Sequence, residues 1–181
     1  YADKDDVPDA YRLWMDVVLT KDHKYVFFPQ ETSGSEYDLY RIPYGKKNAE
    51  AEKVAKNVIS YTVLSNNSFV YLNGDGKLYL SNLKDDEKID SNVSSYQISE
   101  DKKQIIWITE DDKDIYVQDI KLAKDKIKVA SEIENIKTYT ADFSQILVLE
   151  EDEVVLYTDL KDKTKICDSS VGLDYYVDGN D

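Results

Sequence analysis

The sequence predicts an all-β protein, and within that class a β-propeller of about four four-stranded antiparallel blades. Three observations carry this prediction: short apolar segments, turn sequences between them, and a repeat of about 40 residues. The chain has 181 residues, of which 41% are hydrophobic and 12% aromatic. This length allows a substantial core, and the aromatic content separates the chain from disordered acidic sequences.

One segment in each period gives the clearest repeat. Its four copies begin with an apolar residue and occupy residues 39–42, 78–83, 115–120 and 155–160. Their second residues are Tyr40, Tyr79, Tyr116 and Leu156, at spacings of 39, 37 and 40 residues. Four short strands in about 40 residues are the size of one propeller blade.

Three further families of segments accompany these markers. The segments directly before the markers are 25–28, 69–72, 105–108 and 146–149. An earlier segment in each period lies at 17–20, 61–65, 96–99 and 139–141. Short apolar segments also follow the markers, at 89–93, 127–129 and 166–167. They are rich in Val, Ile and Tyr, and most have the length of a strand. We expect one column to pack blade against blade, namely Phe28, Tyr71, Trp107 and Val148.

Turn sequences separate the segments. Asn73-Gly74-Asp75-Gly76 predicts a tight hairpin because Asn and Gly tolerate positive φ. Acidic tetrapeptides occupy the same place at 111–114 and 150–153, and a longer connection covers 29–38. Residues 46–56, taken alone, have the composition of a helix of about three turns. We interpret them as a polar loop that leads into an outer strand at 54–58.

The repeat also suggests blade boundaries. We expect blades at about 11–58, 59–93, 94–133 and 134–171, with the start of a further repeat at 172–181. The chain is then a single propeller domain (1–181) or a segment of a larger propeller. A segment has an unpaired flank, which favours packing against further blades or a homodimer.

Residues 99–107 followed by 115–120 resemble the WD40-like repeat of TolB-type propellers, which also occurs in prolyl-oligopeptidase-type enzymes. The family pattern is Ser-Pro-Asp-Gly-Lys, an apolar strand, and Ile-Tyr-x-x-Asp-Leu. Residues 20–28 form a second copy, and 65–68 and 141–144 are degenerate ones. The Pro and Gly of the pattern are absent from every copy. In this pattern the Ser/Thr and Asp of the first turn hydrogen-bond to the backbone and fix an inner hairpin.

The chain is also similar to divergent, Tyr- and Lys-rich extracytoplasmic propeller domains of Gram-positive bacteria. That resemblance covers about residues 11–171. It implies a location at the cell surface or in the secreted fraction, with an anchor in the full-length protein. It implies no catalytic residues.

Charge and composition exclude several classes of function. The chain has 23 Lys+Arg and 37 Asp+Glu, a net charge of −14 that disfavours nucleic acids and anionic membranes. No apolar run is long enough for a membrane span. A single Cys and a single His exclude a disulfide framework and most metal sites. The start at Tyr1, without Met or a signal peptide, is expected of a trimmed or processed chain.

Four aromatic residues are candidate binding residues, because aromatic side chains are enriched at interfaces. They are Trp14, Tyr37, Tyr44 and Tyr176. Tyr157 belongs with the expected surface tyrosines. Trp107 and the tyrosines at repeat positions are interpreted as core.

No cofactor, metal or catalytic residue is predicted. The acidic clusters lack the spaced ligands and central Gly of a calcium loop, so we interpret them as hairpin tips. His23 is expected to be an exposed turn residue with no nucleophile beside it. Cys167 is expected to be a small buried residue of the last outer strand.

These observations predict a non-enzymatic, extracytoplasmic binding or scaffold module that recognises a protein, peptide or glycan through propeller loops. One alternative is an accessory propeller of a larger enzyme, such as a prolyl-oligopeptidase-type peptidase; a Gly-x-Ser-x-Gly segment in the same reading frame would favour it. Another is a ligand-sensing ectodomain of a membrane-anchored protein. An upstream membrane span with a cytoplasmic output domain would favour the latter.

Overall fold

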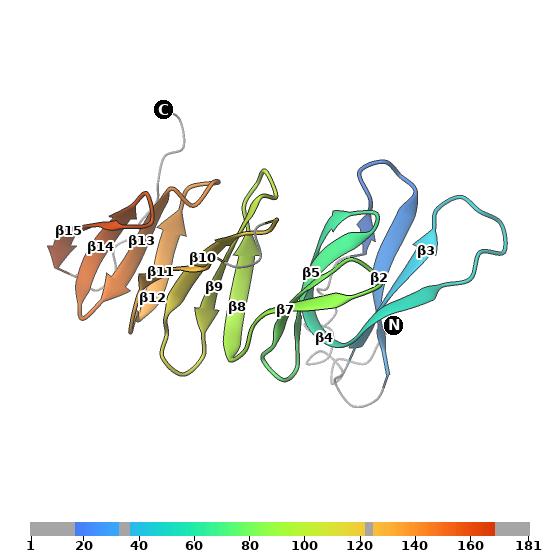
Figure 1. Cartoon of the computed structure of the whole chain (residues 1–181), viewed down its shortest axis with the longest axis horizontal. Coiled ribbons are helices and arrows are strands. Elements are labelled where there is room, and N and C mark those ends of the chain that lie inside the picture. Colours follow the sequence, from blue (N-terminus) through green and yellow to red (C-terminus); the bar gives the residue numbers. More distant parts are fainter. Residues whose placement is uncertain (1–16, 33–36, 122–124, 169–181) are drawn as a thin grey trace, which may run out of the picture. The chain divides into compact units, whose positions relative to one another are not determined.

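The computed structural model describes residues 17–32, 37–121 and 125–168. All regular elements in these residues are β-strands, and every strand pairing is antiparallel (Figure 1). The all-β prediction is therefore confirmed. The chain forms two compact units, unit 1 (Tyr1–Asp90) and unit 2 (Ser91–Asp181).

Unit 1 contains one seven-stranded sheet in which the strands follow their order in the sequence. The strands are β1 (Val18–Leu19), β2 (Tyr25–Glu31), β3 (Tyr37–Pro43), β4 (Glu52–Ser65), β5 (Ser68–Asn73), β6 (Leu78–Ser81) and β7 (Asp86–Asp90). The sheet corresponds to two blades joined through β4. Residues 46–51 form turns and loop, as expected, and β4 begins at Glu52.

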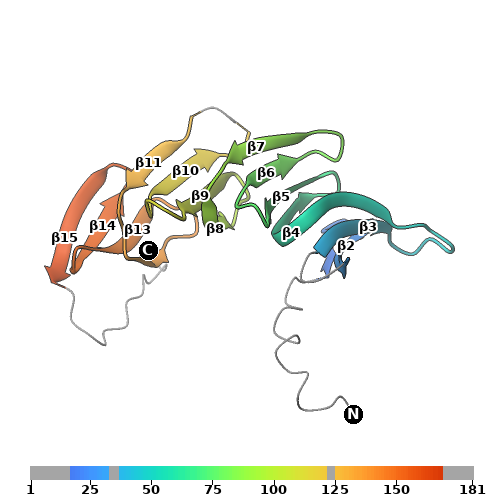
Figure 2. The same ribbon diagram turned by 90° about the horizontal axis from the view of Figure 1, so that it is seen from below.

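The long strand β4 differs from the prediction of separate strands at 54–58 and 61–65. Its 14 residues are continuous, pairing first with β3 and then with β5 (Figure 2). Asn57 has a positive φ of 52°, and the pairing with β5 shifts between Val58 and Ser60. The Gly74 N–H donates to the Asn57 carbonyl at 2.9 Å, and a Cβ on Gly74 would meet the Asn57 side chain at 2.6 Å. A local bend, rather than a break, therefore changes the strand's partner.

Unit 2 contains two four-stranded sheets, each ordered as a propeller blade. The first has β8 (Val93–Ile98), β9 (Gln104–Thr109), β10 (Ile115–Asp119) and β11 (Ile127–Ala130); the second has β12 (Asn135–Tyr139), β13 (Gln145–Glu150), β14 (Glu153–Thr158) and β15 (Asp162–Asp168). Apolar residues of both sheets share one core, which includes Ile106, Val117, Phe143, Ile146 and Val155. The core of unit 1 includes Phe27, Leu39, Val58, Phe69 and Tyr71.

A pair of stacked aromatic rings crosses the two central strands in three of the four blades. The pairs are Phe28–Tyr40 with ring centroids 5.9 Å apart, Tyr71–Tyr79 at 5.1 Å and Trp107–Tyr116 at 5.5 Å. The fourth blade has Val148 opposite Val155 at this register. Leu156 is therefore wrong as the fourth repeat marker, and Val155 takes that place.

Phe28 also differs from its predicted role. Tyr71, Trp107 and Val148 of the expected column are buried, but Phe28 is only half-buried. Successive residues of a strand point to opposite faces, and it is Phe27 that enters the core of unit 1. Phe28 lies on the other face and is not part of the core cluster that contains Phe27.

Candidate binding surface at the inner turns

Three turns between the first and second strands of a blade share one hydrogen-bond pattern. In the β1–β2 turn, Thr20 Oγ1 donates to Asp22 Oδ1 at 3.0 Å, and the Lys24 and Tyr25 N–H groups donate to Asp22 Oδ1 and Thr20 Oγ1. The turns of unit 2 repeat this arrangement with Ser99/Asp101 and Thr140/Asp142. The expected fixing of the inner hairpins by Ser/Thr and Asp is confirmed.

The residue after each of these aspartates has a left-handed backbone. His23, Lys102 and Phe143 all have φ near 59°. This is the position where the family pattern has Gly, the residue that adopts positive φ without steric cost. The chain keeps the turn geometry without Gly, at the expense of local strain.

The three aspartates are held as ionised hydrogen-bond acceptors. The side-chain hydrogen bond from Lys103, helped by Ser99, lowers the pKa of Asp101 to about 2. A hydrogen bond from Asn66 is the main cause of a lowered pKa at Asp22, and the Ser144 N–H is the main cause at Asp142. Such carboxylates order the turns and are poorly suited to general acid catalysis near neutral pH.

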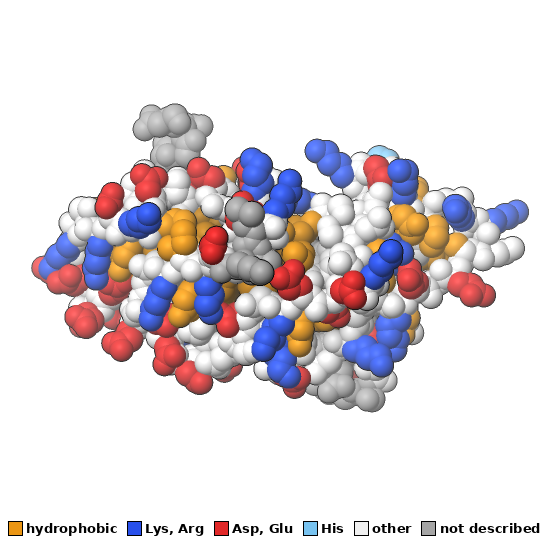
Figure 3. Space-filling model, viewed as in Figure 1, with side chains coloured by type: hydrophobic (Ala, Val, Ile, Leu, Met, Phe, Trp, Pro, Cys, Tyr) orange, Lys and Arg blue, Asp and Glu red, His pale blue; other side chains and the backbone are white. Residues whose placement is uncertain are grey.

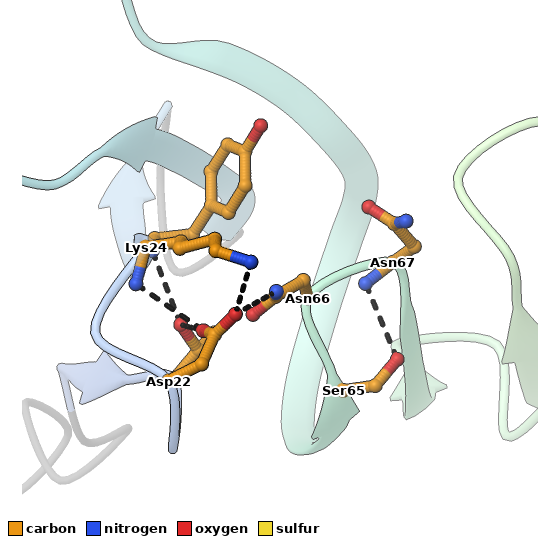
Figure 4. Close-up of polar contacts among 7 residues, drawn as sticks. Asp22, Lys24, Ser65, Asn66 and Asn67 are labelled. Atoms are coloured by element: carbon orange, nitrogen blue, oxygen red, sulfur yellow. Dashed lines mark hydrogen bonds and ion pairs between the residues drawn. The ribbon is translucent and has the colours of Figure 1, made fainter.

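Neighbouring inner turns of unit 1 are joined by side chains (Figure 4). Asn66 Nδ2, in the β4–β5 turn, donates to Asp22 Oδ2 at 2.5 Å. Arg41 Nη1 donates to the Asn66 carbonyl at 3.0 Å and to Asn67 Oδ1 at 3.2 Å. Arg41 also forms an ion pair with Glu52 at 2.8 Å, and its side chain is only 13% exposed. Arg41 therefore fixes the second inner turn beside the first.

An exposed aromatic residue lies next to these turns. Tyr44 is 58% exposed, and its backbone N–H donates to the Lys24 carbonyl at 2.8 Å. Lys24 in turn forms an ion pair with Asp22 at 3.1 Å. We call Asp22, Lys24, Tyr44, Asn66 and Asn67 the turn surface.

The structure places the other predicted binding residues elsewhere. Tyr37 is half-buried at the first residue of β3, opposite Val58, whereas Tyr44 follows the last residue of β3. A rise of about 3.3 Å per residue puts their backbones roughly 20 Å apart, so they do not form one site. Trp14 and Tyr176 lie outside the described residues.

The burial of several single residues can be compared with the burial that the sequence predicts. Trp107 is fully buried, as expected, and His23 is exposed. The surface assignment of Tyr157 is wrong, because only 6% of this residue is exposed. Its neighbour Leu156 is half-buried instead, since adjacent strand residues face opposite ways. Cys167 lies in the outer strand β15 but is only partly buried.

A recurring Tyr–Lys pair between the third and fourth strands of each blade was not predicted from the sequence. The cross-strand partners are Tyr40 and Lys53, Tyr79 and Lys88, Tyr116 and Lys128, and Tyr157 and Lys163. In three blades the Lys also neutralises a buried carboxylate, of Asp38, Asp114 or Glu150. An Asp two residues before the marker tyrosine, in Asp38-x-Tyr40 and Asp114-x-Tyr116, is the signal that could have revealed it.

The described residues contain no group of three or more His, Cys, Asp or Glu side chains arranged to hold a metal ion. No helix in this part of the chain could cross a membrane. On the face drawn in Figure 3, Lys and Arg side chains are interspersed with Asp and Glu side chains.

Comparison with known proteins supports the propeller assignment. No curated protein matches the chain. One similar solved chain comes from the crystal structure of a nidogen/laminin complex, with 9% identity and a TM-score of 0.51; the match covers 81% of this chain and 61% of that one. Another is a putative 6-phosphogluconolactonase from Bacteroides uniformis, with 17% identity, a TM-score of 0.49, and coverage of 84% and 54%.

The chain thus spans about three fifths of the first similar structure and about half of the second. A family model described as the NUP159/214 beta propeller matches residues 8–178, nearly the whole sequence. The blade-like four-stranded sheets and the repeated inner turns agree with this match. The chain belongs to the NUP159/214 β-propeller family.

Proposed function

We propose that the chain is a non-enzymatic binding module that recognises a protein or peptide through the turn surface of unit 1. The observation that carries this proposal is the exposed Tyr44, held beside inner turns that Arg41 and Asn66 fix in place. Tyrosine is enriched at protein interfaces because it offers a large apolar ring with a polar end.

The rigidity of the turn surface favours binding. Asp22 and the backbone of Asn66 already have hydrogen-bond partners, and the lowered pKa of Asp22 keeps it ionised. A surface that is ordered before contact loses less conformational entropy on association. The turn surface is therefore ordered before contact, and its exposed Tyr44 ring is available to a partner.

The fold supports the same proposal in a general way. Propellers present loop-lined faces, and the similar nidogen/laminin structure is itself an assembly of two proteins. We further propose an extracytoplasmic location, on the basis of the resemblance to Tyr- and Lys-rich propeller domains of Gram-positive bacteria. We also propose that the chain packs against further propeller blades or against a second copy of itself.

The test begins with capture of a partner by the immobilised chain from the surface and secreted proteins of the source cells. The partner is then purified, and its Kd is measured for the wild type and for Tyr44→Ala. We expect Tyr44→Ala to weaken binding at least about tenfold, or about 1.4 kcal/mol.

Ile166→Ala is the matched control, because Ile166 is similarly exposed at 53% but lies on β15 of unit 2. It should leave Kd unchanged. Equal Kd values for Tyr44→Ala and the wild type would reject the turn surface as the site. Turnover of peptide or glycoside substrates by the purified chain would reject the non-enzymatic role.

A further inference from the structure

A cavity of about 380 Å³ opens between the two sheets of unit 2. One wall comes from β11 and the residue after it, with Val129, Ala130 and Ser131; the other comes from β13, β14 and β15, with Glu150, Tyr157 and Lys163. Its volume falls within the range of about 300–1,000 Å³ that is usual for ligand pockets. We call it the blade cavity.

Two buried polar groups line the blade cavity. Glu150 is 7% exposed, and its Oε1 accepts a hydrogen bond of 2.6 Å from the Tyr157 hydroxyl. Its Oε2 accepts one of 2.5 Å from Lys163 Nζ. Burial and the hydrogen bond to Glu150 raise the pKa of Tyr157 to about 12, and the same carboxylate raises the pKa of Lys163. The cavity therefore keeps a carboxylate, an ammonium and a protonated hydroxyl together at neutral pH.

A second lysine, Lys128, borders the blade cavity, but the Asp114 carboxylate balances its charge. Lys128 pairs with Tyr116, on the face opposite to Ile115 and Val117 of the core. Its ammonium forms an ion pair with Asp114 at 2.7 Å. The charge of Lys163 is thus balanced by Glu150, and the polar lining of the cavity is close to neutral.

The sequence of the fourth blade explains why Tyr157 reaches Glu150. Glu150 is opposite Glu153, four residues from Tyr157 along β14. Val155 lies between them on the same face, where other blades have Tyr. The valine is smaller than the tyrosine of the other blades, and the Tyr157 hydroxyl reaches past it to the Glu150 carboxylate.

The remaining hydrogen-bonding capacity indicates the class of ligand. A carboxylate offers about four acceptor positions and an ammonium three donors, so Glu150 and Lys163 keep capacity beyond their mutual contact. A ligand hydroxyl can accept from one and donate to the other with a single atom. An anion would face Glu150 and a chain of net charge −14, and a cation would face Lys163. We propose that the blade cavity binds an uncharged, polyhydroxylated ligand such as one sugar unit of a glycan.

The test is an NMR titration of the ¹⁵N-labelled full chain with glucose, galactose, N-acetylglucosamine and their β-linked disaccharides. Inorganic phosphate represents anionic ligands, and an uncharged Gly/Ser peptide represents peptide ligands. We expect at least one sugar to give saturable shifts at the amides of 129–131 and Glu150. No saturable shift with any of these sugars, or tighter binding of phosphate or peptide at the same amides, would overturn the proposal.

Matched variants then test the assignment of the polar groups. Glu150→Gln and Lys163→Met should each weaken sugar binding by about tenfold or more. Lys53→Met and Asp38→Asn alter the equivalent pair in unit 1, whose residues do not line the cavity, and should leave the affinity unchanged. Thermal unfolding checks that each variant is folded, and Glu150→Gln alone decides if Lys163→Met does not fold. Equal losses in both pairs would contradict the assignment.

Discussion

At the residue scale, the left-handed position of the inner turns shows how the chain departs from its repeat pattern. His23 is exposed there, whereas Phe143 is buried in the core of unit 2 and its ring contacts Tyr139 edge-on. A non-glycine residue at positive φ costs of order 1 kcal/mol. The cost at Phe143 is offset by its burial, but His23 has no comparable apolar contact.

Replacing His23 with Gly should therefore stabilise unit 1. We expect His23→Gly to raise the free energy of unfolding by roughly 0.5–1 kcal/mol, because Gly adopts φ near 59° without strain. Chemical denaturation measures the change. Lys21→Gly, at an exposed turn position without positive φ, is the control and should be neutral or destabilising. A loss of stability in His23→Gly would show that the side chain matters more than the backbone.

The inner-turn aspartates also make stability depend on pH. The pKa of Asp101 falls from its ordinary 3.8 to about 2 in the folded chain, chiefly through the Lys103 side chain. A depressed folded-state pKa contributes stability above the ordinary value and loses it as pH falls toward the folded value. Asp101→Asn should thus be less stable than the wild type near neutral pH, and the difference should shrink from about pH 4 toward pH 2.

Urea unfolding at a series of pH values measures this difference. Asp85→Asn, in the exposed β6–β7 turn, is the matched control for the loss of one negative charge. A gap between wild type and Asp101→Asn that stays constant down to about pH 2 would contradict the assigned role of the ionised carboxylate.

At the element scale, the stacked aromatic pairs of the central strands differ more in burial than in the angle between their rings. Trp107–Tyr116 and Phe28–Tyr40 are both stacked with an interplanar angle of 20°. Trp107 is completely buried and Phe28 is half-buried. The same cross-strand pair therefore contributes unequally to stability in the two units.

Trp107→Ala should lower the free energy of unfolding by about 3–5 kcal/mol, the usual cost of removing a buried aromatic side chain. Phe28→Ala should cost clearly less, because part of that ring is already in contact with water. Hydrogen exchange resolved by residue measures each effect in its own unit. Equal losses in the two variants would mean that Phe28 is buried in solution.

The sequence predicts strand positions better than it predicts strand boundaries and faces. Short apolar segments predicted the positions of β2, β5, β9 and β13, and Ser/Thr–Asp turns marked the start of three of them, because both signals are local properties of the sequence. The continuity of β4 was not predictable, since it depends on the contact between Asn57 and Gly74, 17 residues apart. The Val148–Val155 register was also missed, because a one-residue slip leaves an equally apolar sequence.

The candidate site was predicted only in part. Tyr44 was selected because it lies outside the repeat, and the structure shows it exposed beside the inner turns. Arg41, which fixes the turn surface, gave no signal, because its partners Asn66 and Asn67 are about 25 residues away. Glu150 and Tyr157 were assigned to a hairpin tip and the surface, because the contact that buries them spans two strands.

At the scale of the whole molecule, the family match extends over both compact units of the chain. The family model covers residues 8–178, so the propeller assignment applies to both units. The chain has a net charge of −14, and on the face shown in Figure 3 Lys and Arg side chains lie among the Asp and Glu side chains. Such a surface limits edge-to-edge association of strands while leaving local surfaces for specific contacts.

The strand β4 has a consequence for how such a protein can be rebuilt. Two blades that share one uninterrupted strand cannot be separated by cutting a loop, because a cut near Ile59 would interrupt the backbone within a sheet. The two sheets of unit 2 are instead joined by the short connection 131–134 between β11 and β12. Because Ile133 in that connection is buried in the core, insertion of a reporter should instead be tolerated between the exposed Lys84 and Asp85 of the β6–β7 turn, and it should fail within β4.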